Sequence, residues 1–381
     1  MGIDMKPSSE DLLAGLLDWV RIETHTPDVE GLNRLMDLVA SQAAAFGATT
    51  ERFPGRDGHG DHLLVRSPWG DHSRPGILFL SHLDTVHPRG TIDKDLPIRI
   101  DGDRCYGPGI CDMKGGAYNG LAAMRTVAAG IEAGGIPPAL AVSILFTSDE
   151  EVGSPTSQAL IERLGGTAKY ALVTEPARNG GHVVTARKGV GRFTLKVEGR
   201  PAHAGARHWQ GRSAVTELAH QIIALEAMTD YDREITVNVG EIRGGTGTNV
   251  VPQFASAEID LRVPTLAAAE EMVARITGLT PKTPDTKLTI TGGMNRPPFE
   301  QSAASKALFD QAARLADEIG FELIGETTGG GSDGNFIADK VPTLDGLGPD
   351  GDDVHTLNEH IFIPSLGERM QLMVRLIETL D

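Results

Sequence analysis

The chain has 381 residues, 40% of them hydrophobic, which is enough for one large core and a second, smaller domain. Its 35 basic and 52 acidic side chains give a formal net charge of -17. This charge argues against nucleic acid or an anionic membrane surface as the main partner.

The first twenty residues show no sign of a targeting segment. They contain Glu10, Asp11 and Asp18 and no uninterrupted apolar core, so neither a signal peptide nor an anchor is expected. No later apolar run is long enough to span a bilayer. The two cysteines, Cys105 and Cys111, are too few for a disulfide framework, and a reducing cytoplasm is the expected location.

The first half of the chain alternates predicted helices and strands. Ser8 and Asp11 predict a capping box before a helix that ends near Val20. Further helices are expected over residues 29–46, 115–129 and 156–164, and buried strands over residues 63–66, 77–80, 139–146 and 170–173. This alternation predicts an α/β fold, with a mainly parallel sheet flanked by helices on both faces.

The pattern changes near Gly189 and returns near residue 296. Between them, alternating strands (193–197, 235–242, 255–263 and 287–291) and two helices (213–228 and 266–276) predict an inserted α+β sandwich over residues 190–295. The chain then continues with a helix over 302–319, strands over 322–325 and 342–347, and a last helix over 364–380. We therefore expect a discontinuous first domain, residues 1–189 and 296–381.

Residues that bind metals follow three of the predicted strands. The carboxyl ends of strands in an open α/β sheet form the usual place for a site, so side chains there can converge. Imidazole and carboxylate donors in this number favour a hard-to-borderline cation, most naturally zinc. The candidates at the strand ends are His82, Asp84, Asp149, Glu150, Glu151 and Glu175, and Asp112 in the next loop and His355 near the C-terminus could join them.

Two other features allow alternative interpretations. Cys111 stands beside Asp112 and could be a ligand or a nucleophile, but a small buried thiol is favoured because no CxxC spacing is present. The glycine-rich turn over residues 329–334 could offer backbone amides to an anion or be only a connection, and it lacks the spacing of a dinucleotide site.

The chain resembles a known family through the motifs HLDTV, YGPGICDMKGG, TSDEEVGS, TEPA, GRPAHAG, GGTGTNVVP, DLRV and TGGGSDGNF and a late histidine. It is similar to the di-zinc carboxypeptidases and deacylases, which include glucarpidase-type glutamate carboxypeptidases, acetylornithine deacetylase, succinyl-diaminopimelate desuccinylase and aminoacylases. Within this family the YGPG, RKG and TGGGSD segments look most like the glutamate carboxypeptidase branch. The resemblance implies a zinc-peptidase catalytic domain with an inserted dimerisation or lid domain.

The resemblance also implies roles for the candidate ligands. Two Zn²⁺ ions, for which Co²⁺ can substitute, would share a hydroxide and lower its pKa. Glu150 would act as general base and proton shuttle, and Asp84 would orient His82. Family members often have a cis peptide after the bridging aspartate, here Asp112–Met113. By this resemblance His82 and Glu175 hold one zinc, Glu151 and His355 the other, and Asp112 bridges both.

In the insert, the resemblance implies residues that contact the substrate. His203 would reach the oxyanion from the partner chain of a homodimer or after lid closure. Asn249 and Arg262 would hold the substrate, and outside the insert the turn at Gly330 and Gly331 could offer backbone amides to an anion. For Arg262 a structural pair with Asp260 on the same strand face is the open alternative.

The function expected is hydrolysis of the amide bond before a C-terminal amino acid with a free carboxylate, a small-molecule substrate. An N-acyl amino acid deacylase differs only on the acyl side, which the sequence does not define. A non-catalytic binder would lack a ligand or Glu150, and none is missing. A Ser-His-Asp hydrolase is disfavoured because no Gly-x-Ser-x-Gly elbow precedes a helix.

Overall fold

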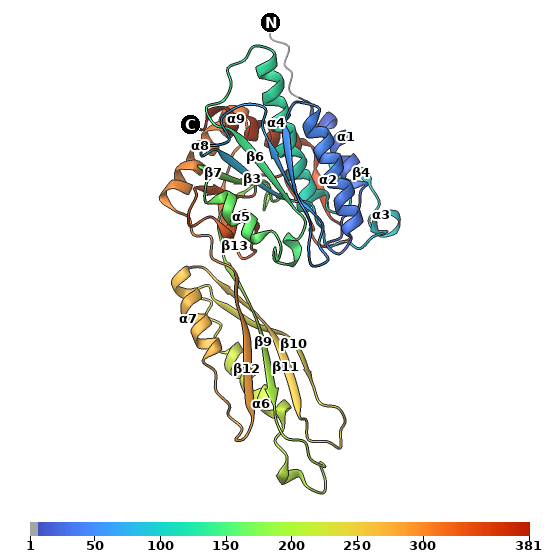
Figure 1. Cartoon of the computed structure of the whole chain (residues 1–381), viewed down its shortest axis with the longest axis vertical. Coiled ribbons are helices and arrows are strands. Elements are labelled where there is room, and N and C mark those ends of the chain that lie inside the picture. Colours follow the sequence, from blue (N-terminus) through green and yellow to red (C-terminus); the bar gives the residue numbers. More distant parts are fainter. Residues whose placement is uncertain (1–6) are drawn as a thin grey trace. The chain divides into compact units, whose positions relative to one another are not determined.

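The structure, a computed structural model, describes residues 7–381; residues 1–6, the start of the segment in which no leader is expected, lie outside it. The chain forms two compact units, labelled by element in Figure 1. One contains the residues up to 185 together with 301–327 and 332–381, and the other contains 186–300 and 328–331. Within residues 7–381, no helix has both the length and the hydropathy needed to cross a bilayer.

A six-stranded sheet forms the centre of the first unit, in the order β1-β2-β6-β3-β7-β14. Neighbours from β6 to β14 pair in parallel, whereas β1 and β2 extend the sheet in antiparallel fashion. The mainly parallel sheet confirms the predicted fold class. The strands are β1 (Thr49–Phe53), β2 (His62–Arg66), β3 (Ile77–His82), β6 (Val142–Thr147), β7 (Tyr170–Val173) and β14 (Thr343–Leu344).

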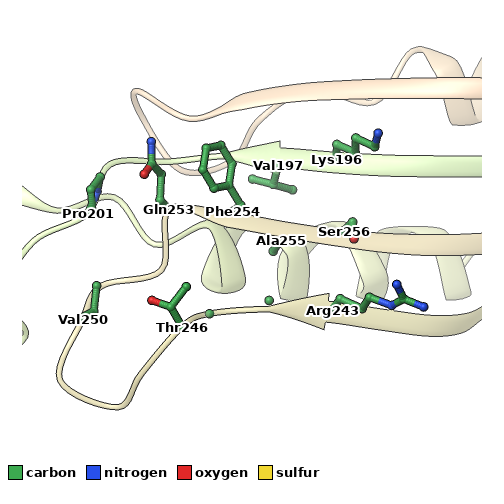
Figure 2. Close-up of a pocket in the computed structure, with 12 residues that line it drawn as sticks. Lys196, Val197, Pro201, Arg243, Thr246, Val250, Gln253, Phe254, Ala255 and Ser256 are labelled. Atoms are coloured by element: carbon green, nitrogen blue, oxygen red, sulfur yellow. The ribbon is translucent and has the colours of Figure 1, made fainter.

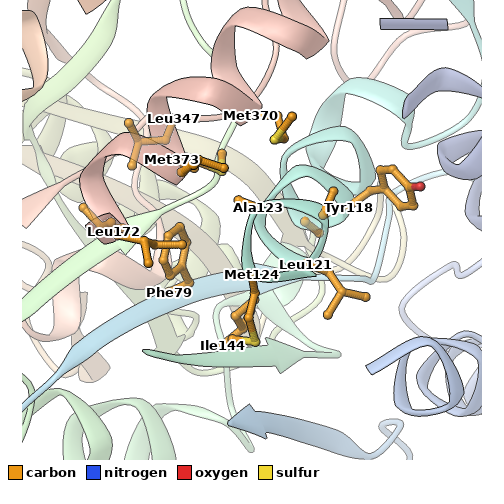
Figure 3. Packing of buried hydrophobic residues seen from close by; sticks show 14 of the residues in the cluster. Phe79, Tyr118, Leu121, Ala123, Met124, Ile144, Leu172, Leu347, Met370 and Met373 are labelled. Atoms are coloured by element: carbon orange, nitrogen blue, oxygen red, sulfur yellow. The ribbon is translucent and has the colours of Figure 1, made fainter. Parts of the chain in front are cut away.

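Helices cover both faces of this sheet because its strands are apolar on both sides. Phe79 of β3 packs in the large core with α4 and α9, while its neighbours Leu78 and Leu80 pack in a second core with α5. Figure 3 shows Phe79, Ile144 and Leu172 beside side chains of α4 and α9. The helices are α1 (Ser9–Val20), α2 (Val29–Ala44), α3 (Thr91–Lys94), α4 (Gly116–Glu132), α5 (Gln158–Gly165), α8 (Ala303–Ile319) and α9 (Ile363–Thr379).

Local signals located the helix ends well and the short strands poorly. The capping box of Ser8 and Asp11 is present at the start of α1. A second sheet, in the order β15-β16-β5-β4, was not predicted because its strands of two or three residues are too short to show a period. The strand predicted over 322–325 is wrong, since β13 (Gly325–Thr328) begins where it should end and pairs with β8 (Val183–Arg187). The small sheet contains β4 (Arg99–Asp101), β5 (Arg104–Tyr106), β15 (Gly351–Asp352) and β16 (His360–Phe362).

The second unit is an antiparallel sheet with helices packed on one face, the predicted α+β sandwich. Its strand order is β10-β11-β9-β12. Along β9, Phe193, Leu195 and Val197 are buried in the core of this unit, whereas the alternating positions Arg192 and Lys196 are exposed. The elements are β9 (Gly189–Glu198), α6 (Ala214–Glu226), β10 (Thr236–Gly244), β11 (Phe254–Val263), α7 (Leu266–Thr277) and β12 (Lys287–Arg296).

Candidate metal centre

The carboxyl ends of three adjacent parallel strands carry most of the candidate ligands. His82 is the last residue of β3, Glu150 and Glu151 lie in a short turn after β6, and Glu175 lies two residues after β7. Because β6, β3 and β7 are neighbours in the sheet, these side chains meet at one edge. Donor atoms of His82, Glu150 and Glu175 lie within 4.8 Å of one another, as do those of His82, Asp112 and Glu151.

The imidazole of His82 is buried and held in one orientation. Its Nδ1 lies 3.0 Å from the backbone oxygen of Asp84 and 3.4 Å from the Asp84 carboxylate. Because a carbonyl oxygen only accepts, Nδ1 carries the proton and donates it. Nε2 lies 3.1 Å from Asp112 Oδ1 and 3.7 Å from Glu175 Oε1, which leaves it as the nitrogen suited to bind a metal.

Asp84 connects the end of β3 to the turn that follows β6. Its Oδ1 accepts a hydrogen bond from the backbone of Glu150 at 3.1 Å, and its Oδ2 accepts one from the backbone of Glu151 at 3.2 Å. The hydroxyl of Thr26 also donates to Oδ2, at 2.9 Å. Thr26 belongs to no motif, and nothing local in the sequence indicates this contact.

Asp112 lies between two imidazoles. Its Oδ1 faces His82 Nε2 at 3.1 Å, and its Oδ2 faces His355 Nε2 at 3.2 Å. The same nitrogen of His355 lies 3.2 Å from Glu151 Oε2. The bond from Asp112 to Met113 is cis, as the resemblance led us to expect. Each oxygen of Asp112 therefore belongs to a different group of donors.

The electrostatics of this cluster fit a bound cation. Burial, followed by the charge of Asp112, raises the pKa of Glu151 to about 8. Burial also disfavours ionised Asp112, but hydrogen bonds from His355 and His82 hold the pKa of Asp112 below its usual range. The hydrogen bonds that His355 makes to Asp112 and to Glu151 raise the pKa of His355 to about 10.

Glu151 supplies a second indication that the cluster fits a metal. Its Oε1 is buried and has no hydrogen-bond partner among residues 7–381. A buried carboxylate oxygen without a hydrogen-bond donor destabilises the folded state. A divalent cation would give this oxygen a partner and would offset the repulsion between neighbouring carboxylates. Nitrogen and oxygen donors together suit zinc and similar ions.

Two buried aspartates support the turn over residues 150–152. Asp149 accepts four hydrogen bonds, at 2.6 to 3.2 Å, from the two residues that precede α5. Asp333, in the glycine-rich segment, accepts from the hydroxyls of Thr147 and Ser154 on either side of the turn. The acidic run at 149–151 therefore divides into one structural acceptor and two residues that face the site, a division that the sequence does not reveal.

His203 and Asn249 are neighbours in the inserted unit. The N–H of Ala204 donates to the backbone oxygen of Asn249 at 2.9 Å. The backbone N–H groups of Gly205 and Ala206 both donate to His203 Nδ1, at 3.1 Å. A ring nitrogen that accepts cannot carry the proton in neutral imidazole, so Nε2 of this exposed histidine is the donor.

Arg262 is paired with Asp260 in the inserted unit. Its Nε and Nη2 donate to the two oxygens of Asp260 at 2.7 and 2.9 Å. This is the structural pair that the sequence left open beside substrate binding. In the same unit the carbonyl of Gly330 accepts from Arg187 at 3.2 Å, and Gly331 leaves no room for a Cβ beside a neighbouring arginine side chain.

A pocket of about 530 Å³ lies on the sheet of the inserted unit (Figure 2). Lys196, Arg243 and Phe254 line it together with the segment that contains Thr246 and Val250. These residues come from three strands and a loop, so their proximity could not be predicted from the sequence. None of the candidate metal ligands lines this pocket.

The sequence matches the model of peptidase family M20/M25/M40 over residues 78–379. The chain belongs to this peptidase family. It is 28% identical over 372 residues to carboxypeptidase G2 of Pseudomonas sp. (strain RS-16), covering 94% of this chain and 86% of that protein. It is 30% identical over 377 residues to succinyl-diaminopimelate desuccinylase of Burkholderia multivorans, covering 93% and 95%. Among solved structures, aminopeptidase PepT from Bacillus cereus matches with a TM-score of 0.76 and 25% identity, covering 97% and 98%.

Membership of the M20/M25/M40 family makes the chain a hydrolytic enzyme, and the metal dependence typical of the family agrees with the donor cluster. Both cysteines are free and buried. Burial, followed by the charge of Glu359, raises the pKa of Cys111 well above its ordinary value, so the thiol stays protonated. The interpretation of Cys111 as a buried thiol is confirmed.

Proposed function

We propose that this enzyme hydrolyses the amide bond before a C-terminal amino acid with a free carboxylate, in the manner of a glutamate carboxypeptidase. The observation that supports this most is the convergence of two imidazoles and three carboxylates at one sheet edge, with Glu150 beside them. The likeness to carboxypeptidase G2 supports the carboxypeptidase assignment. The desuccinylases at similar identity make an N-acyl amino acid deacylase the second candidate.

We propose that the cluster binds two Zn²⁺ ions, for which Co²⁺ can substitute. The two oxygens of Asp112, which face different imidazoles, support a bridging role. Two such ions, when bound, would supply the Lewis acidity that activates water as a nucleophile near neutral pH. His82, Asp112 and Glu175 would hold the first ion, and Asp112, Glu151 and His355 the second.

Glu150 is proposed to take the proton from that water and to transfer it to the nitrogen of the leaving amine. Its carboxylate lies within 4.8 Å of donor atoms of His82 and Glu175, so it stands at the same sheet edge as the proposed ligands. Its backbone N–H donates to Asp84 Oδ1 at 3.1 Å, which holds the main chain of Glu150 beside the cluster. This role leaves Glu150 outside the five-ligand set.

The inserted unit is proposed to join two chains into a homodimer. β10 is an edge strand of its sheet, and Val215, Ile223 and Ile242 on α6 and β10 are 40%, 70% and 61% exposed. An unpaired strand edge beside exposed apolar side chains is suited to pairing with a second copy. In such a dimer, His203 and Asn249 would act on the substrate of the partner chain, with His203 Nε2–H donating to the oxyanion.

Substrate recognition is proposed to depend on Arg262, with backbone amides of Gly330 and Gly331 contributing to an anion-binding turn. A small-molecule substrate fits this arrangement. The formal charge of -17 supports the proposal that neither nucleic acid nor a membrane is a partner. The two free cysteines support a cytoplasmic location.

A substrate panel assayed with zinc-loaded protein tests the activity. It contains a folyl-glutamate, N-acetyl and N-succinyl amino acids, and dipeptides. The highest kcat/KM on the glutamate-terminated substrates is expected. A clear preference for N-succinyl or N-acetyl amino acids would move the assignment to the deacylases, and no hydrolysis of any member would contradict the proposal.

Mixed dimers test the contribution of the partner chain. His203→Ala protein and Glu150→Gln protein are each expected to be nearly inactive. If His203 acts on the partner's substrate, a mixture should recover activity, because one of the two sites then combines an intact Glu150 with an intact His203. Demonstrated subunit exchange without recovered activity would count against this arrangement.

A further inference from the structure

Glu359 is a buried carboxylate whose two oxygens are both fully used. Its side chain is 1% exposed. Oε2 accepts from His87 Nε2 at 2.6 Å and from the backbone N–H of Gly109 at 3.0 Å. Oε1 accepts from the backbone N–H groups of Cys111 and Asp112, both at 2.9 Å. Four N–H groups thus converge on one carboxylate.

Three of the four donors are backbone N–H groups, which can only donate, so each carboxylate oxygen of Glu359 accepts a hydrogen bond from the loop over residues 109–112. His87 Nε2 adds a contact of 2.6 Å to Oε2. Three hydrogen bonds from one buried side chain to a four-residue loop hold that loop in one position.

The segments that meet at Glu359 each carry a candidate metal ligand. His87 lies five residues after His82, the 109–112 loop ends at Asp112, and Glu359 lies four residues after His355. One side chain therefore links the three segments that present the two imidazoles and the aspartate between them.

The backbone of Glu359 is itself fixed by the small sheet. β16 begins at the next residue and pairs with β5, with His360 opposite Tyr106. The N–H of Gly107 donates to the backbone oxygen of Glu359 at 3.3 Å. In contrast, the side chain of His355 is 52% exposed, so little packing determines its place. His355 lies in the loop between β15 and β16, which pair with each other, and Glu359 is the residue at the end of this loop that also binds the 109–112 segment.

We propose that Glu359 is a positioning residue of the metal centre: by holding the 109–112 loop and His87, it sets the spacing between Asp112 and His355 and so the affinity and geometry of the metal bound there. This inference rests on the metal-dependent hydrolysis proposed above. Groups that orient ligands without touching the metal typically change metal affinity about 10- to 100-fold when altered. A loop anchor with no such role would change only the stability of the fold.

The main variant is Glu359→Gln, which keeps the shape but replaces one accepting oxygen by an NH₂ group that faces N–H donors. We expect the affinity for Zn²⁺, measured by competition with a chelator, to fall about 10- to 100-fold. At saturating Zn²⁺, kcat should fall while KM stays unchanged, because the substrate contacts are intact. The absorption spectrum of the Co²⁺-loaded variant should also change, since it reports the geometry of the ligands.

Glu326→Gln is the matched control. Glu326 accepts from His182 Nδ1 at 2.9 Å and from Asn179 at 2.8 Å in the same unit, and so it is also part of a His–Glu pair. This variant should bind Zn²⁺ with wild-type affinity. If Glu359→Gln matched Glu326→Gln in Zn²⁺ affinity, kcat and Co²⁺ spectrum, and only its melting temperature fell, Glu359 would be a loop anchor and the proposal would be overturned.

A second variant covers the case in which Glu359→Gln does not fold. His87→Phe removes one donor and leaves the three backbone bonds, so Zn²⁺ affinity should fall in the same direction but by less. Unchanged affinity in His87→Phe would overturn the proposal. The affinity measurement needs no substrate, so if the wild type hydrolysed nothing in the panel, the proposed function would fail while this inference stayed testable.

Discussion

Replacing Arg262 by lysine separates substrate recognition from a structural ion pair. The guanidinium uses its Nε and Nη2 edge for the two oxygens of Asp260. The second edge, formed by Nη1 and Nη2, still carries N–H donors. Among residues 7–381, Nη1 donates only to the carbonyl of Gly329, at the long distance of 3.4 Å. This edge could bind a substrate carboxylate through two parallel N–H bonds. Lysine would keep the positive charge but could not form both bonds in this planar geometry.

The two roles of Arg262 differ in expected magnitude. Its side chain is 31% exposed and that of Asp260 is 37% exposed, so the pair should contribute only about 0.2 to 1 kcal/mol to stability. A hydrogen bond between charged groups that forms with substrate is worth about 1.5 to 3 kcal/mol. At 1.36 kcal/mol per decade, losing this hydrogen bond lowers kcat/KM by roughly ten- to 160-fold.

The assay measures kcat/KM of the wild type and Arg262→Lys on a substrate and on its C-terminal amide. Recognition of the carboxylate predicts a much larger loss on the acid than on the amide. Asp260→Asn is the control, since it removes the structural partner and keeps the fork, and it should reduce kcat/KM on the acid less than Arg262→Lys does. Equal losses on acid and amide, or a loss that follows unfolding, would leave Arg262 with a structural role only.

The remaining predictions concern the turn after β6 and the helix α4. Glu150→Gln should retain metal and lose about 10²- to 10⁴-fold in kcat, whereas Glu151→Gln should weaken metal binding, and identical behaviour in both assays would show that the roles are wrong. In metal-free protein the pKa of Glu151 is raised from 4.5 to about 8, so the folded state binds this proton more tightly than the unfolded state. Stability should therefore fall as pH rises through this range, and melting curves of chelator-treated Glu151→Gln should show a smaller fall. Gly116→Ala places a Cβ 1.8 Å from the backbone oxygen of Thr174 and should destabilise the fold by about 3 kcal/mol or more in denaturant titrations. In the same helix Gly130→Ala meets nothing within 4 Å and should be neutral or stabilising by up to about 1 kcal/mol.

Local patterns in the sequence were sufficient for the sheet and for the residues at its edge. Apolar runs identify β3, β6 and β7. Strands of a parallel sheet are buried on both faces, so their consecutive residues are apolar. The position of His82, Glu150 and Glu175 just after these runs then follows from chain direction alone. The motifs supplied the family, which the match over residues 78–379 confirms.

Only the tertiary structure assigned partners to the polar groups. Asp84 receives a hydrogen bond from Thr26, 58 positions away, and Glu359 binds amides of the 109–112 loop about 250 positions away. Asp149 and Glu150 are adjacent in an acidic run, yet one is a buried structural acceptor and the other faces the metal cluster. Hydrogen bonds of this kind join single atoms across distant segments, so they leave no period in the sequence, and which donor meets which carboxylate is decided only when the chain has folded.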